Sequence, residues 1–446
     1  MIHSSAFDTN FNWGVAISSL QNEGASFHDG KGASIWDDFS KQRGKIFRNQ
    51  SPAQATEFYF RYKTDIDIAH QLGFNSFRFS FSWSRLIPDG SGQVNIKAVN
   101  FYRSMIDYCL EKNLTPMATL YHWDLPLELE KKGGWCNPSI LLWFNRYAKI
   151  CANLFGDKVK HWLVLNEPLS FTALGYLIGL HAPGKRRSKY FIPAVQHACI
   201  AQAEGGRVLR EFVPDSIIGT SFSCSEVTAA TEKKEDQDAA KRVDLLMNQL
   251  FIQPVLGNGF PYRENFELLQ RLEIENRSWR FRNRMCFDFD FIGLQNYFPI
   301  VVKHQPFIPL IQAIDVKAKK RMMPHTDLGW EINPNAFYNI IRELSTLFPG
   351  KQIFITENGA CFKDKLVDGK VSDIQRCDFF ESHLAALKRL VDDGVFLNGY
   401  YVWTLTDNFE WHQGYNARFG LVYIDYKNQE RILKQSAFWW KDFLQS

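Results

Sequence analysis

The sequence has little net charge and no long hydrophobic run. Its formal net charge is +4 in 446 residues, which gives no reason to expect nucleic acid or an anionic membrane as a partner. No uninterrupted apolar stretch is long enough to span a bilayer. Residues 1–10 contain neither the basic nor the apolar segment of a secretory signal peptide. These absences predict a soluble, cytoplasmic protein.

The cysteines lack the spacing of a zinc site or of a redox motif. There are eight, scattered along the chain without a Cys-x-x-Cys pair, and several lie in apolar runs, as reduced and buried cysteines do. The sequence also lacks a glycine-rich loop of the phosphate-binding kind. We therefore expect a reducing compartment, no metal and no cofactor.

What the sequence does contain is a regular alternation of apolar strands and helical patterns. The composition is ordinary for a globular protein, with 45% hydrophobic and 22% charged residues. Buried-type strands separated by helices are typical of a parallel sheet, and eight such units favour a closed barrel. The fold class is therefore α/β, a single (β/α)8 TIM barrel with long βα loops that occupies residues 1–446. The expected strands are 12–18, 76–83, 115–121, 161–165, 217–223, 291–295, 352–356 and 398–404. The expected helices include 55–72, 98–112, 139–154, 192–212, 236–248, 334–347 and 374–393.

Three polar stretches stand out between these units. Residues 299–333 follow the sixth strand and predict a long, irregular loop over the active face. The basic run 185–189 follows the fourth strand and predicts a solvated loop, with steering of anionic ligands as the alternative. The mixed run 232–236 predicts the solvated start of a helix.

Two glutamates stand where an apolar strand stops. Glu167 follows the run His161–Asn166, and Glu357 follows the run Gln352–Thr356. In an α/β barrel the carboxyl ends of the strands form the rim on which catalytic residues stand. Two carboxylates on that rim are the minimum equipment for cleaving a glycosidic bond.

The residues at the other strand ends suit a ligand rich in hydroxyl groups. Amide, imidazole, carboxylate and indole side chains that face one cavity can both donate to and accept from a sugar. They are Gln21, Glu23, Arg78, His122, Trp123, Asp124, Asn166, Asn296, Tyr297, Asn358, Trp403, Asn408, Glu410 and Trp411. The fifth strand, with Ser223 to Ser225, offers less.

In its motifs the sequence resembles glycoside hydrolase family 1, the β-glucosidase family. The resemblance runs in order over nearly the whole chain. Single motifs are weak evidence, but their joint occurrence in order, each at a strand end, is strong. They are residues 11–16 (FNWGVA), 21–24 (QNEG), 77–85 (FRFSFSWSR), 120–126 (LYHWDLP), 165–168 (LNEP), 181–184 (HAPG), 295–297 (QNY), 356–359 (TENG) and 407–411 (DNFEW).

The resemblance implies a retaining β-glycosidase, in which Glu167 is the acid/base and Glu357 the nucleophile. It places Arg78 and Tyr297 beside Glu357, where both would favour the charged carboxylate. It implies that Asn166 bonds the 2-hydroxyl of the sugar. The remaining substrate-binding residues by this resemblance are Gln21, His122, Trp123, Asn296, Tyr297, Trp403, Glu410 and Trp411. The expected partner is a small β-glycoside, and the oligomeric state is left open.

Glu410 indicates which class of glycosides to expect as substrates. The resemblance places it, with Gln21 and Trp411, at the O4/O6 edge of the non-reducing sugar. An anionic side chain there suits free hydroxyls and repels a 6-phosphate, so we expect unphosphorylated glycosides. Glu167 is not Gln, the residue found in the family's thioglucosidases, which favours O-glycosides. We expect a β-glucosidase with β-galactosidase or β-fucosidase side activity.

Several alternatives stay open at this stage. His122 could be a core histidine, Arg78 an internal ion-pair partner, and Trp403 and Trp411 packing residues only. Glu23 is expected to be structural, and Trp13, Trp36 and Trp83 to belong to the core. The chain could also work mainly as a transglycosylase, or be a silent glycan-binding relative. The segment 55–61 and Leu20 depart from the family pattern, which concerns packing near the site.

Overall fold

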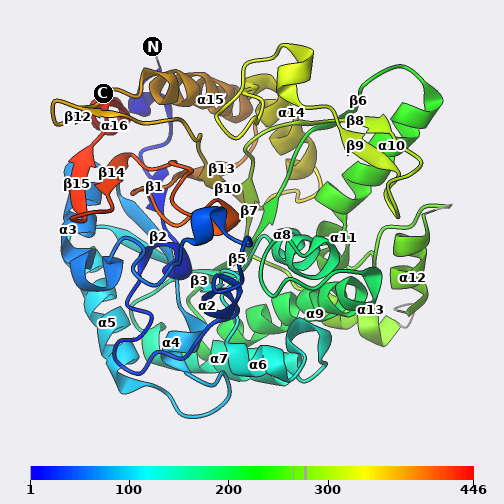
Figure 1. Ribbon diagram of the computed structural model, residues 1–446, viewed down its shortest axis with the longest axis horizontal. Coiled ribbons are helices and arrows are strands. Elements are labelled where there is room, and N and C mark those ends of the chain that lie inside the picture. Colours follow the sequence, from blue (N-terminus) through cyan, green and yellow to red (C-terminus); the bar gives the residue numbers. More distant parts are fainter. Residues whose placement is uncertain (1, 265, 276–278) are drawn as a thin grey trace.

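The computed structural model describes residues 2–264, 266–275 and 279–446, and its centre is a closed barrel of parallel strands. Around the barrel the strands follow the order β1-β13-β10-β7-β5-β4-β3-β2, and each neighbouring pair is parallel. The predicted TIM barrel is therefore confirmed (Figure 1). The strands are β1 (Asn12–Ala16), β2 (Ser76–Ser80), β3 (Thr115–Tyr121), β4 (His161–Asn166), β5 (Ile217–Ser223), β7 (Phe291–Gln295), β10 (Gln352–Asn358) and β13 (Leu397–Trp403).

The eight apolar runs predicted from the sequence are all barrel strands; β3, β5 and β7 have the predicted bounds, and the other five have shifted ends. The largest shift is in β2, which ends at Ser80 because Trp83 begins a short helix, α4 (Trp83–Leu86). The strands are almost entirely buried; in β2 all five residues are. The barrel closes by pairing of β1 with β13, so both ends of the chain contribute to it.

Helices form the layer outside the barrel. Each predicted helix is present, with ends displaced by a few residues. They are α3 (Phe58–Gln71), α5 (Ile96–Glu111), α7 (Ile140–Phe155), α9 (Ser188–Phe212), α10 (Lys234–Asp244), α14 (Pro334–Ser345) and α15 (Ile374–Asp392). The C-terminal helix α16 (Gln435–Leu444) packs against α15. Within the described residues, no helix is long and apolar enough to cross a membrane.

The region between β5 and β7 is more elaborate than one helix. After α10 the chain continues as a π-helical segment, η5 (Leu245–Gln249), and then as α11 (Ile252–Val255), α12 (Glu267–Glu275) and α13 (Trp279–Met285). The helix predicted over 236–248 is thus an α-helix that changes to π geometry in its last turn. In Figure 1 these elements cover one flank of the barrel.

The prediction of an irregular loop over 299–333 was wrong in part. This stretch contains β8 (Ile300–His304) and β9 (Ala313–Asp315), which form a three-stranded sheet with β6 (Val227–Ala229). The strands were missed because their partner β6 comes from the loop after β5, and pairing between distant segments leaves no local signal. Of the run 185–189, residues 185–187 form a partly exposed loop as predicted, whereas 188 and 189 already begin α9. The run 232–236 leads into α10 as predicted.

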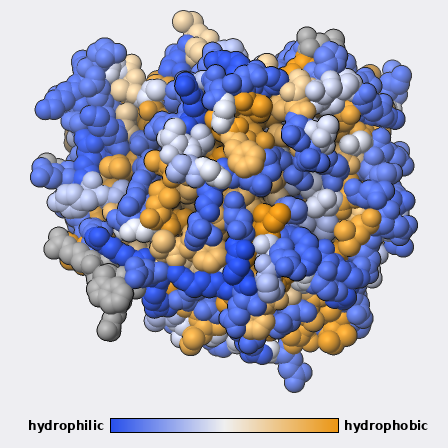
Figure 2. Space-filling view, turned by 180° about the vertical axis from the view of Figure 1, so that it is seen from behind, coloured by the Kyte–Doolittle hydropathy of each residue, from blue (hydrophilic) through white to orange (hydrophobic). Residues whose placement is uncertain are grey.

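The aromatic residues mostly pack in the interior. Trp13, Trp36 and Trp83 are buried, as expected. Figure 2 shows the face opposite to that of Figure 1, where hydrophobic residues are scattered among a majority of hydrophilic ones.

Candidate active site

The barrel brings Glu167 and Glu357 to the same rim. Glu357 lies near the end of β10, and Glu167 directly follows β4. The backbone of Glu167 is left-handed (φ 43°), and Pro168 then begins the short helix α8 (Pro168–Thr172). Both glutamates are buried, with exposed fractions of 7% and 4%. Their charges are close enough to influence each other, because Glu357 is one cause of the shifted pKa of Glu167.

Each carboxylate oxygen of Glu357 has its own donor. Arg78 donates from Nη1 to Oε1 at 2.5 Å, and the Tyr297 hydroxyl donates to Oε2 at 2.7 Å. The guanidinium of Arg78 is 1% exposed, so this ion pair is dry. Charge-assisted hydrogen bonds of this kind fix a carboxylate in one orientation.

Asn166 connects Glu357 to the neighbouring strands. Its Oδ1 accepts from Arg78 Nη2 at 2.5 Å and from Gln295 Nε2 at 2.8 Å. Its Nδ2 lies 3.1 Å from Nε2 of His122, to which it donates. Burial, with the charge of Arg78, holds the pKa of His122 well below its usual range. A neutral His122 can accept from Asn166, so it is part of the site's network rather than an isolated core residue.

Glu167 holds its proton near neutral pH. Burial, followed by the negative charge of Glu357, raises the pKa of Glu167 to about 8. The hydroxyls of Ser170 and Ser223 and the charge of Arg78 oppose this shift. Two nearby carboxylates in different environments can divide acid and base roles between them, and this pair has that asymmetry.

Glu410 is a third carboxyl on the rim and is half-buried. Gln21 donates from Nε2 to its Oε2 at 3.2 Å, and the Gln21 carbonyl accepts from Ser18 at 2.7 Å. Burial, followed by the charge of Glu357, raises the pKa of Glu410 to about 8 as well. The three glutamates therefore share one electrostatic environment, although they come from different strands.

Buried indole rings pack beside these groups. Trp411 stacks on Trp123 with ring centroids 4.4 Å apart, and it also packs on Trp36 at 4.8 Å. The ring of His122 lies parallel to that of Trp403 at 5.9 Å. Trp123 donates from Nε1 to the backbone carbonyl of Asn166 at 2.8 Å. These tryptophans therefore pack in the interior and also lie next to the residues of the candidate site.

The side chain of Asn296 is tied to the backbone of the site. It donates from Nδ2 to the carbonyl of Cys224 at 2.8 Å, and its own backbone carbonyl accepts from Asn358 at 2.6 Å. Glu23, expected to be structural, accepts from Arg85 at 2.7 Å and from Tyr102 at 2.6 Å. That expectation is confirmed. Within the described part of the chain, no group of three or more His, Cys, Asp or Glu residues could hold a metal ion.

Comparison with known proteins fits this arrangement. The family model described as "Glycosyl hydrolase family 1" matches residues 3–446. The chain belongs to this family. Hydrolysis of glycosides is therefore its class of reaction.

Individual relatives agree with the family assignment. A 1,4-beta-D-glucan glucohydrolase of Thermotoga neapolitana is 39% identical, over 99% of this chain and 98% of its own length. The structure of the beta-glucosidase from Thermotoga maritima in complex with glucoimidazole superposes with a TM-score of 0.93 at 39% identity, covering 98% of each chain. A 6-phospho-beta-galactosidase of Clostridium acetobutylicum is 32% identical over 98% of this chain and 96% of its own.

Two residues that hydrogen-bond Asn166 were not predicted as site residues, although Gln295 belongs to the motif at 295–297. Gln295 ends β7 and donates to Asn166, and Ser221, within β5, donates to the same Oδ1 at 3.1 Å. The sequence carried one usable signal for Gln295, an amide at the end of a wholly apolar strand. Ser221 had none, because only the barrel register shows that it lies opposite Asn166.

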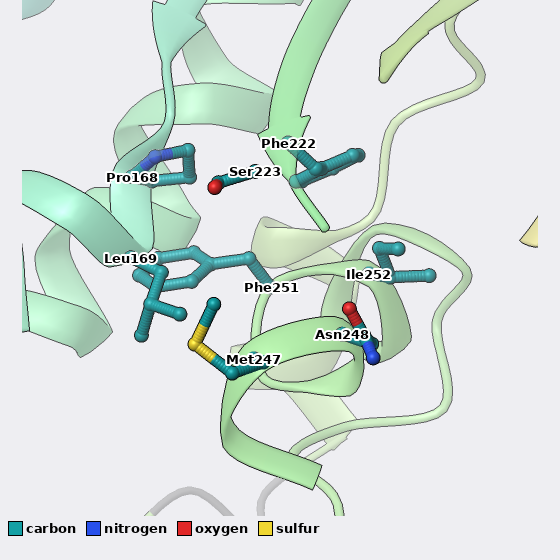
Figure 3. Close-up of a pocket in the computed structure, with 8 residues that line it drawn as sticks. All are labelled: Pro168, Leu169, Phe222, Ser223, Met247, Asn248, Phe251 and Ile252. Carbon is teal, nitrogen blue, oxygen red and sulfur yellow. The ribbon is translucent and has the colours of Figure 1, made fainter. Parts of the chain in front are cut away.

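A small cavity lies next to Pro168, the residue that follows Glu167. Pro168 and Ser223 form one wall, and Met247, Asn248 and Phe251 form the other (Figure 3). Its volume of about 10 Å³ is at the lower limit for one water molecule. The cavity is too small for a sugar and is therefore not a substrate site.

Proposed function

We propose that this chain is a retaining β-glucosidase in which Glu357 is the nucleophile and Glu167 the acid/base. The observation that carries the proposal is the difference between the two carboxyls. Glu357 is an ion-paired acceptor held by Arg78 and Tyr297, whereas the pKa of Glu167 is raised to about 8. A nucleophile must be ionised and an acid must be protonated at the same pH.

In the first step an oxygen of Glu357 attacks the anomeric carbon. The bond to the leaving-group oxygen breaks, and Glu167 transfers its proton to that oxygen. Arg78 and Tyr297 hold the attacking carboxylate in place. Asn166, fixed by Arg78, Gln295 and His122, faces the site as the partner for the 2-hydroxyl, an interaction that strengthens in the transition state.

In the second step the roles of Glu167 reverse. Once Glu357 is esterified it has lost its negative charge, which is one of the causes of the raised pKa of Glu167. Glu167 is then a better base, and it takes a proton from the water that attacks the anomeric carbon. The bond to Glu357 breaks, and the sugar leaves with its original configuration.

We propose that the non-reducing sugar contacts the side chains of four residues, Gln21, Glu410, Trp403 and Trp411. A half-buried carboxyl at the O4/O6 edge supports unphosphorylated sugars, because Glu410 places a carboxyl where a phosphate would need a positively charged partner. His122, Trp123 and Asn296 complete the proposed contacts. Because one relative is named a 6-phospho-beta-galactosidase, the tolerance of this edge for a phosphate is a point that an assay must decide.

We also propose a substrate class, a cellular location and a domain organisation for the enzyme. The Thermotoga glucan glucohydrolase supports terminal glucose units of β-1,4-glucans, and hence cellulose degradation, as the substrate class. The eight cysteines are all free thiols, which supports a reducing, cytoplasmic location. Pairing of β1 with β13 supports one catalytic domain over residues 1–446.

A panel of aryl β-glycosides tests the proposal. We expect turnover of the glucoside, weaker turnover of the galactoside and fucoside, and little of the 6-phosphoglucoside. Proton NMR of the first product should show the β-anomer. An α-anomer as first product would contradict the retaining mechanism, and dominant turnover of the phosphorylated substrate would contradict the role of Glu410. A rate increase with added sugar acceptors would instead indicate a transglycosylase.

A further inference from the structure

A second pocket lies in the region between β5 and β7, apart from the residues of the catalytic site. Its volume is about 480 Å³, within the range of about 300–1,000 Å³ that is usual for small-molecule sites. Amides, carboxyls and one exposed aromatic ring line it. They are Gln249, Gln253, Asn258, Asp244, Glu273 and Tyr262.

The three amides form an ordered chain. Asn258 donates from Nδ2 to Oε1 of Gln253 at 2.7 Å, and Gln253 donates from Nε2 to Oε1 of Gln249 at 2.6 Å. Each amide is thereby fixed in orientation. Among the described residues none accepts from Nε2 of Gln249, so the last amide of the chain presents free donors to the pocket.

The two carboxyls supply acceptors. Glu273 pairs with Arg282 through Oε1, while its Oε2 is buried and has no partner among the described residues. Asp244 accepts from Asn248 at 2.7 Å through Oδ1, and burial raises the pKa of its carboxyl.

Tyr262 adds an apolar surface. Its side chain is 56% exposed although it borders the pocket. An aromatic face beside fixed amide donors and carboxylate acceptors matches a sugar ring, which has apolar faces and hydroxyls that both donate and accept. The carboxyls disfavour anions, and in the described part of the chain no metal-ligating cluster is present.

We propose that this pocket binds a neutral saccharide, glucose or a short β-1,4-glucan, at a site separate from the catalytic one. The identity of the sugar rests on the proposed function, whereas the pocket does not. The η5 segment lies between this pocket and the small cavity next to Pro168 and Ser223. Leu245 and Gln249 border the second pocket, while Met247 and Asn248 border the small cavity next to Ser223 (Figure 3). Substitutions that test the pocket should therefore avoid η5.

Calorimetric titration of the full-length protein with cellobiose tests the inference. The catalytic site is first blocked by a 2-deoxy-2-fluoroglucosyl group on Glu357, confirmed by mass spectrometry. We expect one binding event per chain to remain in the blocked protein. Tyr262→Ala should weaken it about tenfold, equivalent to ~1.4 kcal/mol. The matched control Phe396→Ala removes a similarly exposed ring, 53% exposed, from another part of the surface and should have no effect.

The outcomes separate the two proposals. If Glu357 is not labelled, the proposed function is contradicted. If labelling succeeds and no binding remains, or if Tyr262→Ala and Phe396→Ala behave alike, the second site is overturned. Titration without any substitution gives an independent result. Glucose should bind the blocked protein at least about tenfold more tightly than glucose 6-phosphate, ~1.4 kcal/mol, and equal affinities would also overturn the inference.

Discussion

Arg78 donates a 2.5 Å hydrogen bond to Glu357 from a strand three positions away around the barrel. The same guanidinium donates to Asn166, so one buried cation connects the proposed nucleophile with the strand that leads into the proposed acid/base. The relationship depends on closure of the barrel. Arg78 donates directly to Glu357 and not to Glu167, so the two carboxyls lie in different environments and are expected to play different roles.

Removal of the nucleophile should abolish hydrolysis. We expect Glu357→Ala to lower kcat by about 10⁴-fold or more, because the covalent intermediate can no longer form. Azide should restore activity by attacking in place of the carboxylate, and NMR should show an α-glycosyl azide. A β-glycosyl azide would reverse the two assignments.

The loss of activity on removal of the acid/base should depend on the leaving group of the substrate. For Glu167→Ala we expect kcat/KM to fall by about 10²–10⁴-fold with a poor leaving group and much less with dinitrophenyl glucoside. Azide should then give a β-glycosyl azide, since Glu357 still forms the intermediate. Equal losses on both substrates would contradict the acid role.

The pH dependence of kcat/KM should reflect the ionisation of Glu167. An acid with a pKa of about 8 is protonated below that pH, so kcat/KM should fall as the pH rises through about 8. Glu410 also has a pKa raised to about 8, and Glu410→Gln serves as the control. The alkaline limb should persist in Glu410→Gln and disappear in Glu167→Ala assayed with dinitrophenyl glucoside.

Tyr297→Phe isolates one hydrogen bond to the nucleophile. The change removes the hydroxyl 2.7 Å from Glu357 Oε2 but keeps the ring that packs on Trp330 and Phe419. A hydrogen bond to a charged group contributes about 1.5–3 kcal/mol, so we expect kcat/KM to fall roughly 10- to 100-fold with little change in thermal stability. An unchanged rate would exclude a role in orienting Glu357.

Glu410→Gln should alter the choice of substrate. Replacing this carboxyl by an amide at the O4/O6 edge should reduce glucoside turnover about tenfold or more. The fucoside, which lacks the 6-hydroxyl, should be affected less, so the ratio of kcat/KM values should move towards the fucoside. The same loss on both substrates would place Glu410 away from O6.

A buried ion network should contribute to stability at the edge of the site. Lys434 contacts Asp364 at 2.5 Å and Asp407 at 2.6 Å, and all three side chains are buried. Lys434→Met leaves two buried carboxylates without this partner and should lower the free energy of unfolding by about 3–5 kcal/mol. The matched control Lys388→Met removes a pair on an exposed helix face, with Asp392, and should change it by less than about 1 kcal/mol in urea titrations.

The sequence by itself determined the strands of the barrel and the presence of carboxyls at their ends. Apolar runs such as His161–Asn166 and Gln352–Asn358 have few alternatives to a buried strand, and Pro168 or Gly359 ends them. The motifs around Glu167, Glu357 and Glu410 were sufficient to place the chain in its family.

Only the tertiary structure decided which polar groups share a hydrogen bond. Ser221 and Gln295 contact Asn166 because of the register between strands that are far apart in sequence. The small sheet of β6, β8 and β9 and the pocket near Tyr262 arise in the same way, from segments brought together by folding. Local patterns record the burial and periodicity of one segment, whereas pKa values and pockets depend on what other segments place beside it.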